Sequence, residues 1–140
     1  MNGEWSYYLI LDEFLQAPSE SRRAAAGWAG DRYEIYEGPK PGDVFLAQLT
    51  AWDTESDARE FFDAYAKRTW RRYSGARATE ITSRPADEGA QKGESGQSER
   101  QAWQTDEGGV IAELRGSRVL ILEGIPASSN AKSLVRALWQ

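Results

Sequence analysis

The side-chain types of this chain restrict the chemistry that it could perform. Its 140 residues include no histidine and no cysteine. These absences remove the commonest general base, every Ser-His or Cys-His nucleophile pair, thiolate metal ligands and HExxH zinc chemistry. Catalysis would depend on carboxylates, lysine, tyrosine or serine. The sequence predicts no catalytic residue, no metal site and no cofactor.

Carboxylates are the remaining candidates for acid and base chemistry. Several lie on or near predicted strands, where two of them could face one cleft: Glu34, Glu37, Asp53, Glu113 and Glu123. A carboxylate pair needs a defined separation and a raised pKa on one member, and no spacing in the sequence specifies such a pair. A carboxylate-dependent hydrolase is therefore the third of three functional hypotheses.

The stretch "AAAGWAGDRY", residues 24–33, has two interpretations. Gly27 and Gly30 permit unusual backbone angles, and Trp28 could close the end of a sheet, so a turn leading into a strand explains the stretch. In the functional interpretation, Trp28 is a stacking surface for a ligand, with Asp31 and Arg32 as polar contacts.

A cluster of basic residues is the second candidate site. No acidic residue interrupts positions 64–78, which include Lys67, Arg68, Arg71, Arg72 and Arg77. Cations at the C-terminus of a helix complement the helix dipole, which is the structural interpretation. The alternative is a site for an anion or an acidic partner, with Trp70 and Tyr73 as stacking groups.

Composition and charge limit the partners. The formal net charge of −5 argues against nonspecific binding to nucleic acid or to an anionic membrane. No apolar stretch approaches the ~18 residues that suggest a membrane span. The start, "MNGEWSYYLILDEFL", has no cationic region and does not resemble a signal peptide. A chain that opens directly into a helix could be a piece of a longer protein.

The first half of the sequence predicts a helix, two strands and a second helix. Helical spacing of apolar residues extends over 4–16, and Pro18 is expected to stop that helix. The segment 19–31 is interpreted as a connection. Alternation predicts strands at "RYEIYEG" and "VFLAQLTAW", paired as a hairpin. The helix after Thr54 has a capping signal and one apolar face.

The second half predicts short strands and a closing helix. Residues 83–101 lack large apolar side chains, which predicts an exposed flexible insertion within a single domain, 1–140. Strands are expected around 102–105, at "GVIAELRG" and at "SRVLILEG", and "PASSNAKSLVRALW" is expected to form a capped helix. The fold class is α+β: roughly five antiparallel strands and about three helices, in two β-β-α halves. The two later helices should share one face, with the N-terminal helix beside them or on the opposite face. The second arrangement, with helices on both faces, would give an α/β/α sandwich.

Three segments together resemble a little-characterised bacterial and archaeal domain. They are "AAAGWAGDRYEIYEG", "AWDTESDAREFFDAY" and "LRGSRVLILEGIP", and the shared patterns are GW-GDRY and WD-x3-DA-x-EF. The resemblance implies the C-terminal part of a secreted or lipid-anchored polypeptide with a metallopeptidase-like upstream region. Nothing catalytic carries over, because this chain has no histidine. Ala29 stands where relatives often have a polar residue or glycine.

The leading hypothesis is a non-catalytic accessory or interaction domain of an extracytoplasmic protein, a location that rests on the resemblance alone. Its partner would be the rest of a longer chain or another protein. The second is a small binding module for an anionic or aromatic ligand, through Trp28 or the 67–77 cluster. A cleft lined by these side chains would favour it.

Overall fold

The computed structural model describes residues 2–37, 40–84, 97–127 and 129–139. Two helices, α1 (Glu4–Leu15) and α2 (Pro18–Ala25), precede a hairpin of β1 (Trp28–Glu37) and β2 (Val44–Trp52). A long helix, α3 (Glu55–Arg72), follows the hairpin. The elements after α3 are β3 (Arg77–Arg84), β4 (Ser98–Thr105), β5 (Gly108–Arg115), β6 (Arg118–Ile125) and α4 (Ala131–Leu138).

The six strands form one antiparallel sheet in the order β1-β2-β6-β5-β4-β3. The last four strands form a meander in which each strand pairs with the next. The hairpin joins the meander where β2 pairs with β6, with Leu49 opposite Leu120. Within the described residues, β1 and β3 are the edge strands.

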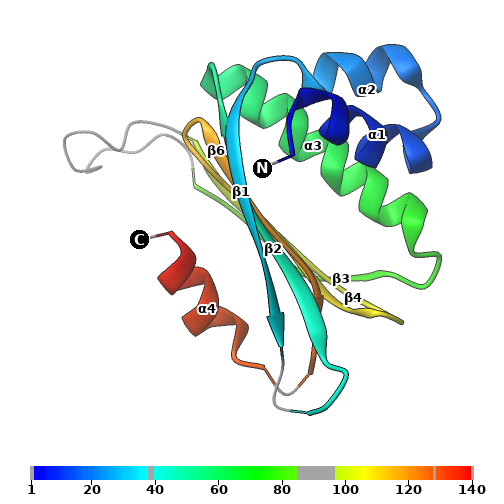
Figure 1. Cartoon of the computed structure of the whole chain (residues 1–140), viewed down its shortest axis with the longest axis vertical. Coiled ribbons are helices and arrows are strands. Elements are labelled where there is room, and N and C mark those ends of the chain that lie inside the picture. The colour runs from blue at the N-terminus through cyan, green and yellow to red at the C-terminus, as the bar shows by residue number, and fades with distance from the viewer. Residues whose placement is uncertain (1, 38–39, 85–96, 128, 140) are drawn as a thin grey trace.

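The sheet separates two apolar cores. Helices α1, α2 and α3 lie together on one face, and α4 is the one helix of the described residues on the other (Figure 1). We call these the three-helix face and the α4 face. The larger core lies under the three helices and includes Tyr7, Trp52, Phe61 and Ile121. The smaller core lies between α4 and the sheet and includes Phe45, Leu120, Leu122 and Val135.

Alternation along β2 and β6 explains why both faces are covered. On β2, Phe45 and Ala47 belong to the α4 core, whereas Trp52 belongs to the three-helix core. On β6, Leu120 faces α4 and Ile121 faces the three helices. Successive side chains of a strand point to opposite faces, so a central strand that is apolar throughout needs cover on both sides.

The fold class is confirmed as α+β with one antiparallel sheet, and the element counts are close but not exact. The described residues form six strands and four helices, where roughly five and about three were expected. Segment 18–25 is a helix: Pro18 ends α1 and also occupies the first turn of α2, where its missing N–H costs nothing. The strand that was missed is β3. The repeat is also not β-β-α twice, because four strands precede α4.

Two predicted placements also change. Helices α3 and α4 lie on opposite faces and not on one, whereas α1 lies beside α3, which is one of the two positions expected for it (Figure 1). The insertion expected at 83–101 is narrower, because β3 extends to Arg84 and β4 begins at Ser98. Residues 85–96 of that insertion lie outside the described residues. No helix in the described ranges has the length and apolar character that a membrane crossing needs.

Candidate functional site

The residues of the GWAGDRY stretch connect the start of α1, β1 and α3. The Trp28 indole N–H donates to Asp31 Oδ1 at 3.1 Å, and the Asn2 backbone N–H donates to Asp31 Oδ2 at 2.8 Å. Trp28 packs against the three-helix core. Both oxygens of Asp31 are therefore occupied within the fold. Arg32 is exposed on β1, and strand alternation directs it to the opposite face from Asp31.

The basic cluster of α3 is paired within the protein. Lys67 Nζ lies 3.0 Å from Glu20 Oε1, and Arg71 Nη1 donates to the Leu15 carbonyl at 2.6 Å. Arg68 and Arg72 both contact Glu123, at 2.5 and 3.2 Å. Because Leu15 ends α1, the Arg71 contact also places a cation at the negative end of that helix.

The Arg68 side chain is only 4% exposed, and Tyr65 and Glu123 surround it. Its Nη1 donates to the Tyr65 hydroxyl at 3.0 Å as well as to Glu123. Burial raises the pKa of the Tyr65 phenol and raises the pKa of Tyr73 to about 12. The group is an internal ion pair that joins α3 to β6, and the cations face a carboxylate of the same chain.

The sequence candidates do not form one site. Trp28 and Asp31 lie near the N-terminus of α3, where Gly27 meets Asp57, whereas Arg68, Arg71 and Arg72 lie in its last turns. The carboxylates are also separated. Glu34 accepts from the Tyr36 hydroxyl on the α4 face, and Glu123 faces α3. In the described part of the chain, no three Asp or Glu residues gather in a way that could hold a metal ion.

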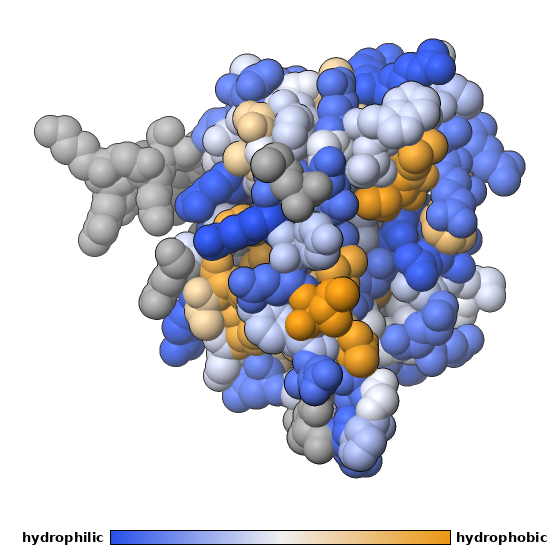
Figure 2. All heavy atoms as spheres, in the orientation of Figure 1, coloured by the Kyte–Doolittle hydropathy of each residue, from blue (hydrophilic) through white to orange (hydrophobic). Residues whose placement is uncertain are grey.

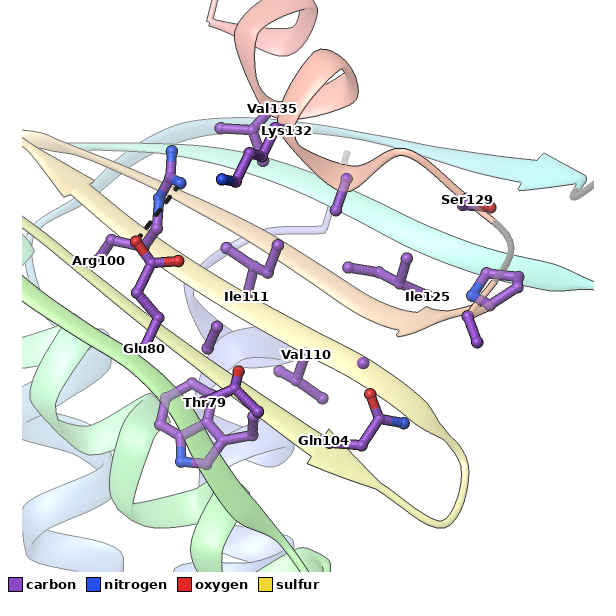
Figure 3. A pocket seen from close by; sticks show the side chains of 16 residues that line it. Thr79, Glu80, Arg100, Gln104, Val110, Ile111, Ile125, Ser129, Lys132 and Val135 are labelled. Atoms are coloured by element: carbon purple, nitrogen blue, oxygen red, sulfur yellow. Dashed lines mark ion pairs between the residues drawn. The ribbon is translucent and has the colours of Figure 1, made fainter.

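A cleft of about 260 Å³ lies on the α4 face, between α4 and strands β3 to β5. We call it the α4 cleft (Figure 3). It exists because the α4 core contains residues of β1, β2, β5 and β6 but, among the described residues, none of β3 or β4. Its floor includes two small residues, Ala102 and Gly109, and two larger apolar residues, Ile111 and Ile125.

The rim of the α4 cleft is charged. Arg100 on β4 and Lys132 on α4 extend toward the same end of the cleft in Figure 3. Arg100 Nη1 lies 3.9 Å from Glu80 Oε1 on β3. Glu80 is the one carboxylate that lines the cleft in the described ranges. A single carboxylate beside an arginine does not make an acid and base pair.

Arg100 is held in place by Glu113 on the neighbouring strand. Arg100 Nε and Nη2 lie 2.9 and 2.8 Å from Glu113 Oε2, and Arg115 Nη2 lies 2.7 Å from Glu113 Oε1. The Glu113 side chain is 6% exposed. Both of its oxygens are engaged, so Glu113, one of the carboxylates that the sequence singled out, positions arginines on the α4 face.

Sequence reasoning missed Glu80, Arg100 and Lys132. Glu80 and Arg100 are diagonal neighbours because β3 pairs with β4, with Thr82 opposite Arg100, and β3 was not recognised as a strand. The alternation of Arg100, Ala102 and Gln104 on one face of β4 was the available signal, but Arg100 fell within the predicted insertion. The helical period predicts that Lys132 lies beside the cleft only when the position of α4 on the sheet is known.

Comparison with known proteins yields one match. Searches of curated proteins and of solved structures gave no match. A sequence model of one family matches residues 1–134, which include both edge strands, the first half of α4 and every residue that lines the α4 cleft except Val135. The chain therefore belongs to the family described as Domain of unknown function (DUF8575).

Proposed function

We propose that this chain is a non-catalytic interaction module that holds an apolar, carboxylate-bearing group of a partner in the α4 cleft. The observation that carries the proposal is the half-covered α4 face, where an apolar floor lies beside Lys132, a cation with no ion pair among the described residues. Ile111 and Ile125 supply apolar contact, and Lys132 supplies positive charge at the end where Arg100 is paired with Glu113 and Glu80. This arrangement matches a group that is apolar at one end and anionic at the other.

The size of the cleft favours part of a partner over a large cofactor. Pockets that enclose drug-sized ligands are typically about 300 to 1,000 Å³, and the α4 cleft is near the lower limit at about 260 Å³. One amino-acid side chain with its terminal carboxylate has a suitable size and charge. The resemblance described above supports the wider setting, an accessory domain of an extracytoplasmic protein whose partner is another chain or another part of its own.

The charge of Lys132 is the contact that a variant can test most cleanly. It is exposed on α4 and, in the described residues, makes no ion pair, whereas Arg100 also stabilises Glu113. Arg136 lies one turn further along α4, is also exposed and does not line the cleft. Lys132→Glu and Arg136→Glu therefore change the net charge by the same amount, but only Lys132→Glu changes a residue that lines the cleft.

The experiment is an NMR titration with N-acetylleucine, and with its neutral amide as the ligand control. We expect shifts of the backbone amides of Ala102, Gly109 and Ile111, with weaker binding of the amide. Lys132→Glu should raise the dissociation constant about tenfold, equivalent to ~1.4 kcal/mol, and Arg136→Glu should leave it within about twofold. Shifts confined to other surfaces, or equal binding of acid and amide, would contradict the proposal.

A further inference from the structure

The outer edge of β1 is long, regular and, within the described residues, unpaired. Its one irregularity lies between Trp28 and Gly30, and the register to β2 is continuous from Gly30 to Glu37. The opposite edge strand, β3, is shorter and has an irregularity between Ala78 and Glu80. Irregular, short edges resist pairing with another chain, whereas a long regular edge presents unpaired backbone N–H and C=O groups.

Apolar side chains accompany this edge on the three-helix face. Tyr33 is 45% exposed and Ile35 is 66% exposed, although both lie on a strand next to the core. Val44, opposite Glu37 on β2, is also exposed. Figure 2 shows hydrophobic surface in the region of β1 and β2, bordered by hydrophilic side chains. A second sheet edge that continued the strand order would cover these side chains.

On the α4 face of β1, the charged side chains are complementary to those of the same strand in a second copy of the chain. Glu34 accepts from Tyr36, and Tyr36 stacks on Phe45 at a ring separation of 5.3 Å, so Glu34 and Tyr36 lie on the α4 face. Arg32 shares that face by the period of two. When two β1 strands pair about a two-fold axis normal to the sheet, residues on one face meet residues on the same face.

We propose that a second copy of this chain pairs with it edge to edge through β1, and that Tyr33 lies on the two-fold axis. In this register each Arg32 lies opposite Glu34 of the other copy, and pairing spans 29–37. Centring on Arg32 or on Glu34 would instead place like charges opposite each other, which destabilises an antiparallel pair. Centring on Ile35 would pair only 33–37 and match no opposite charges.

The pairing would extend the six strands of each copy into one continuous sheet. The two Tyr33 rings and the two Ile35 side chains would form a single apolar strip across the axis, on the face that carries α1 to α3. The α4 cleft borders β3 at the far edge of each copy, so the dimer leaves it open. The inference is thus independent of the proposed function.

A charge exchange tests the register. Sedimentation equilibrium of the whole chain should show a dimer of twice the chain mass. Arg32→Glu and Glu34→Arg should each raise the dimer dissociation constant at least about tenfold, since each places like charges opposite each other twice. An equimolar mixture of the two variants should recover the dimer, because the two negative residues of one strand then face the two positive residues of the other.

Matched variants distinguish dimerisation through the β1 edge from nonspecific association of exposed apolar side chains. Ile35→Lys should abolish the dimer, whereas Ile81→Lys should not, because Ile81 is 65% exposed on the opposite edge strand. Circular dichroism checks that each variant is folded. A wild-type chain that stays monomeric at its solubility limit would overturn the proposal, and so would a dimer that Ile81→Lys disrupts and Ile35→Lys does not.

Discussion

At the scale of single residues, Gly27 shows why the GWAGDRY stretch has its sequence. Its φ is +88°, and a Cβ at this position would lie 2.5 Å from Asp57 Cγ. Asp57 belongs to the cap of α3: its backbone N–H donates to the Thr54 hydroxyl at 3.0 Å, and its carboxylate accepts from the same hydroxyl at 2.8 Å. The Asp53 N–H also donates to the Gly27 carbonyl at 2.7 Å. Gly27 therefore lies where β1 begins and α3 is capped.

We predict that Gly27→Ala lowers the free energy of unfolding by about 2 kcal/mol or more, because the residue would be strained and would displace the cap. Gly30→Ala is the matched control, since its added Cβ would meet nothing within 4 Å and should change stability by less than about 0.5 kcal/mol. Urea denaturation measures both. Equal effects would mean that the close approach to Asp57 does not constrain the fold.

At the scale of elements, the contact between α3 and β6 depends on Glu123. Replacing it with alanine leaves Arg68, whose side chain is 4% exposed, without its carboxylate. A buried charge that loses its partner costs about 3 to 5 kcal/mol, so Glu123→Ala should destabilise the protein by about 3 kcal/mol. Arg72→Ala removes a cation that is 31% exposed and should cost less than about 1 kcal/mol. Chemical denaturation of both variants checks this, and the reverse order would contradict it.

Helices and strands were predictable from sequence where their apolar side chains recur with the period of the helix or strand. The strand "VFLAQLTAW" alternates between the two cores, and β2 has the predicted bounds. In β3, Ile81 is the one large apolar residue and it is exposed, so no periodicity marks the strand. The buried side chains of α2 are Ser21, Ala24 and Ala25, which are too small to give an apolar pattern.

The candidate sites were less predictable because their chemistry depends on distant residues. The basic residues of α3 resembled an anion site until Glu123, 55 positions from Arg68, was placed beside them. Conversely, the α4 cleft exists because α4 covers only part of its face of the sheet, and no local sequence pattern indicates which part stays uncovered. Which distant side chains form ion pairs, and which parts of a sheet face stay exposed, depends on the fold and not on any local sequence pattern.

At the scale of the whole molecule, buried phenols link stability to alkaline pH. The pKa of Tyr73 is raised to about 12 by burial, and burial raises those of Tyr7 and Tyr65 as well. In the unfolded chain a tyrosine ionises near pH 10. Between about pH 10 and 12 the folded state therefore binds more protons than the unfolded state, so stability is retained below pH 10 and falls as pH rises through this range.

We predict that Tyr73→Phe reduces this loss of stability, because the phenol that stays protonated only in the folded state is removed. The Tyr73 hydroxyl has no hydrogen-bond partner among the described residues, so the change removes no such contact. Denaturant midpoints measured from about pH 8 to pH 11 test the difference. Parallel curves for Tyr73→Phe and wild type would refute the link.

The single junction between β2 and β6 also has a consequence for the order of assembly. The hairpin and the meander each form from strands adjacent in the chain, whereas Leu49 meets Leu120 only after α3 and three further strands have been traversed. Local contacts form quickly, and closing a long loop costs chain entropy before contacts compensate for it. We therefore expect the two halves of the sheet to organise separately, and the docking of β2 on β6 to carry the largest cost in chain entropy.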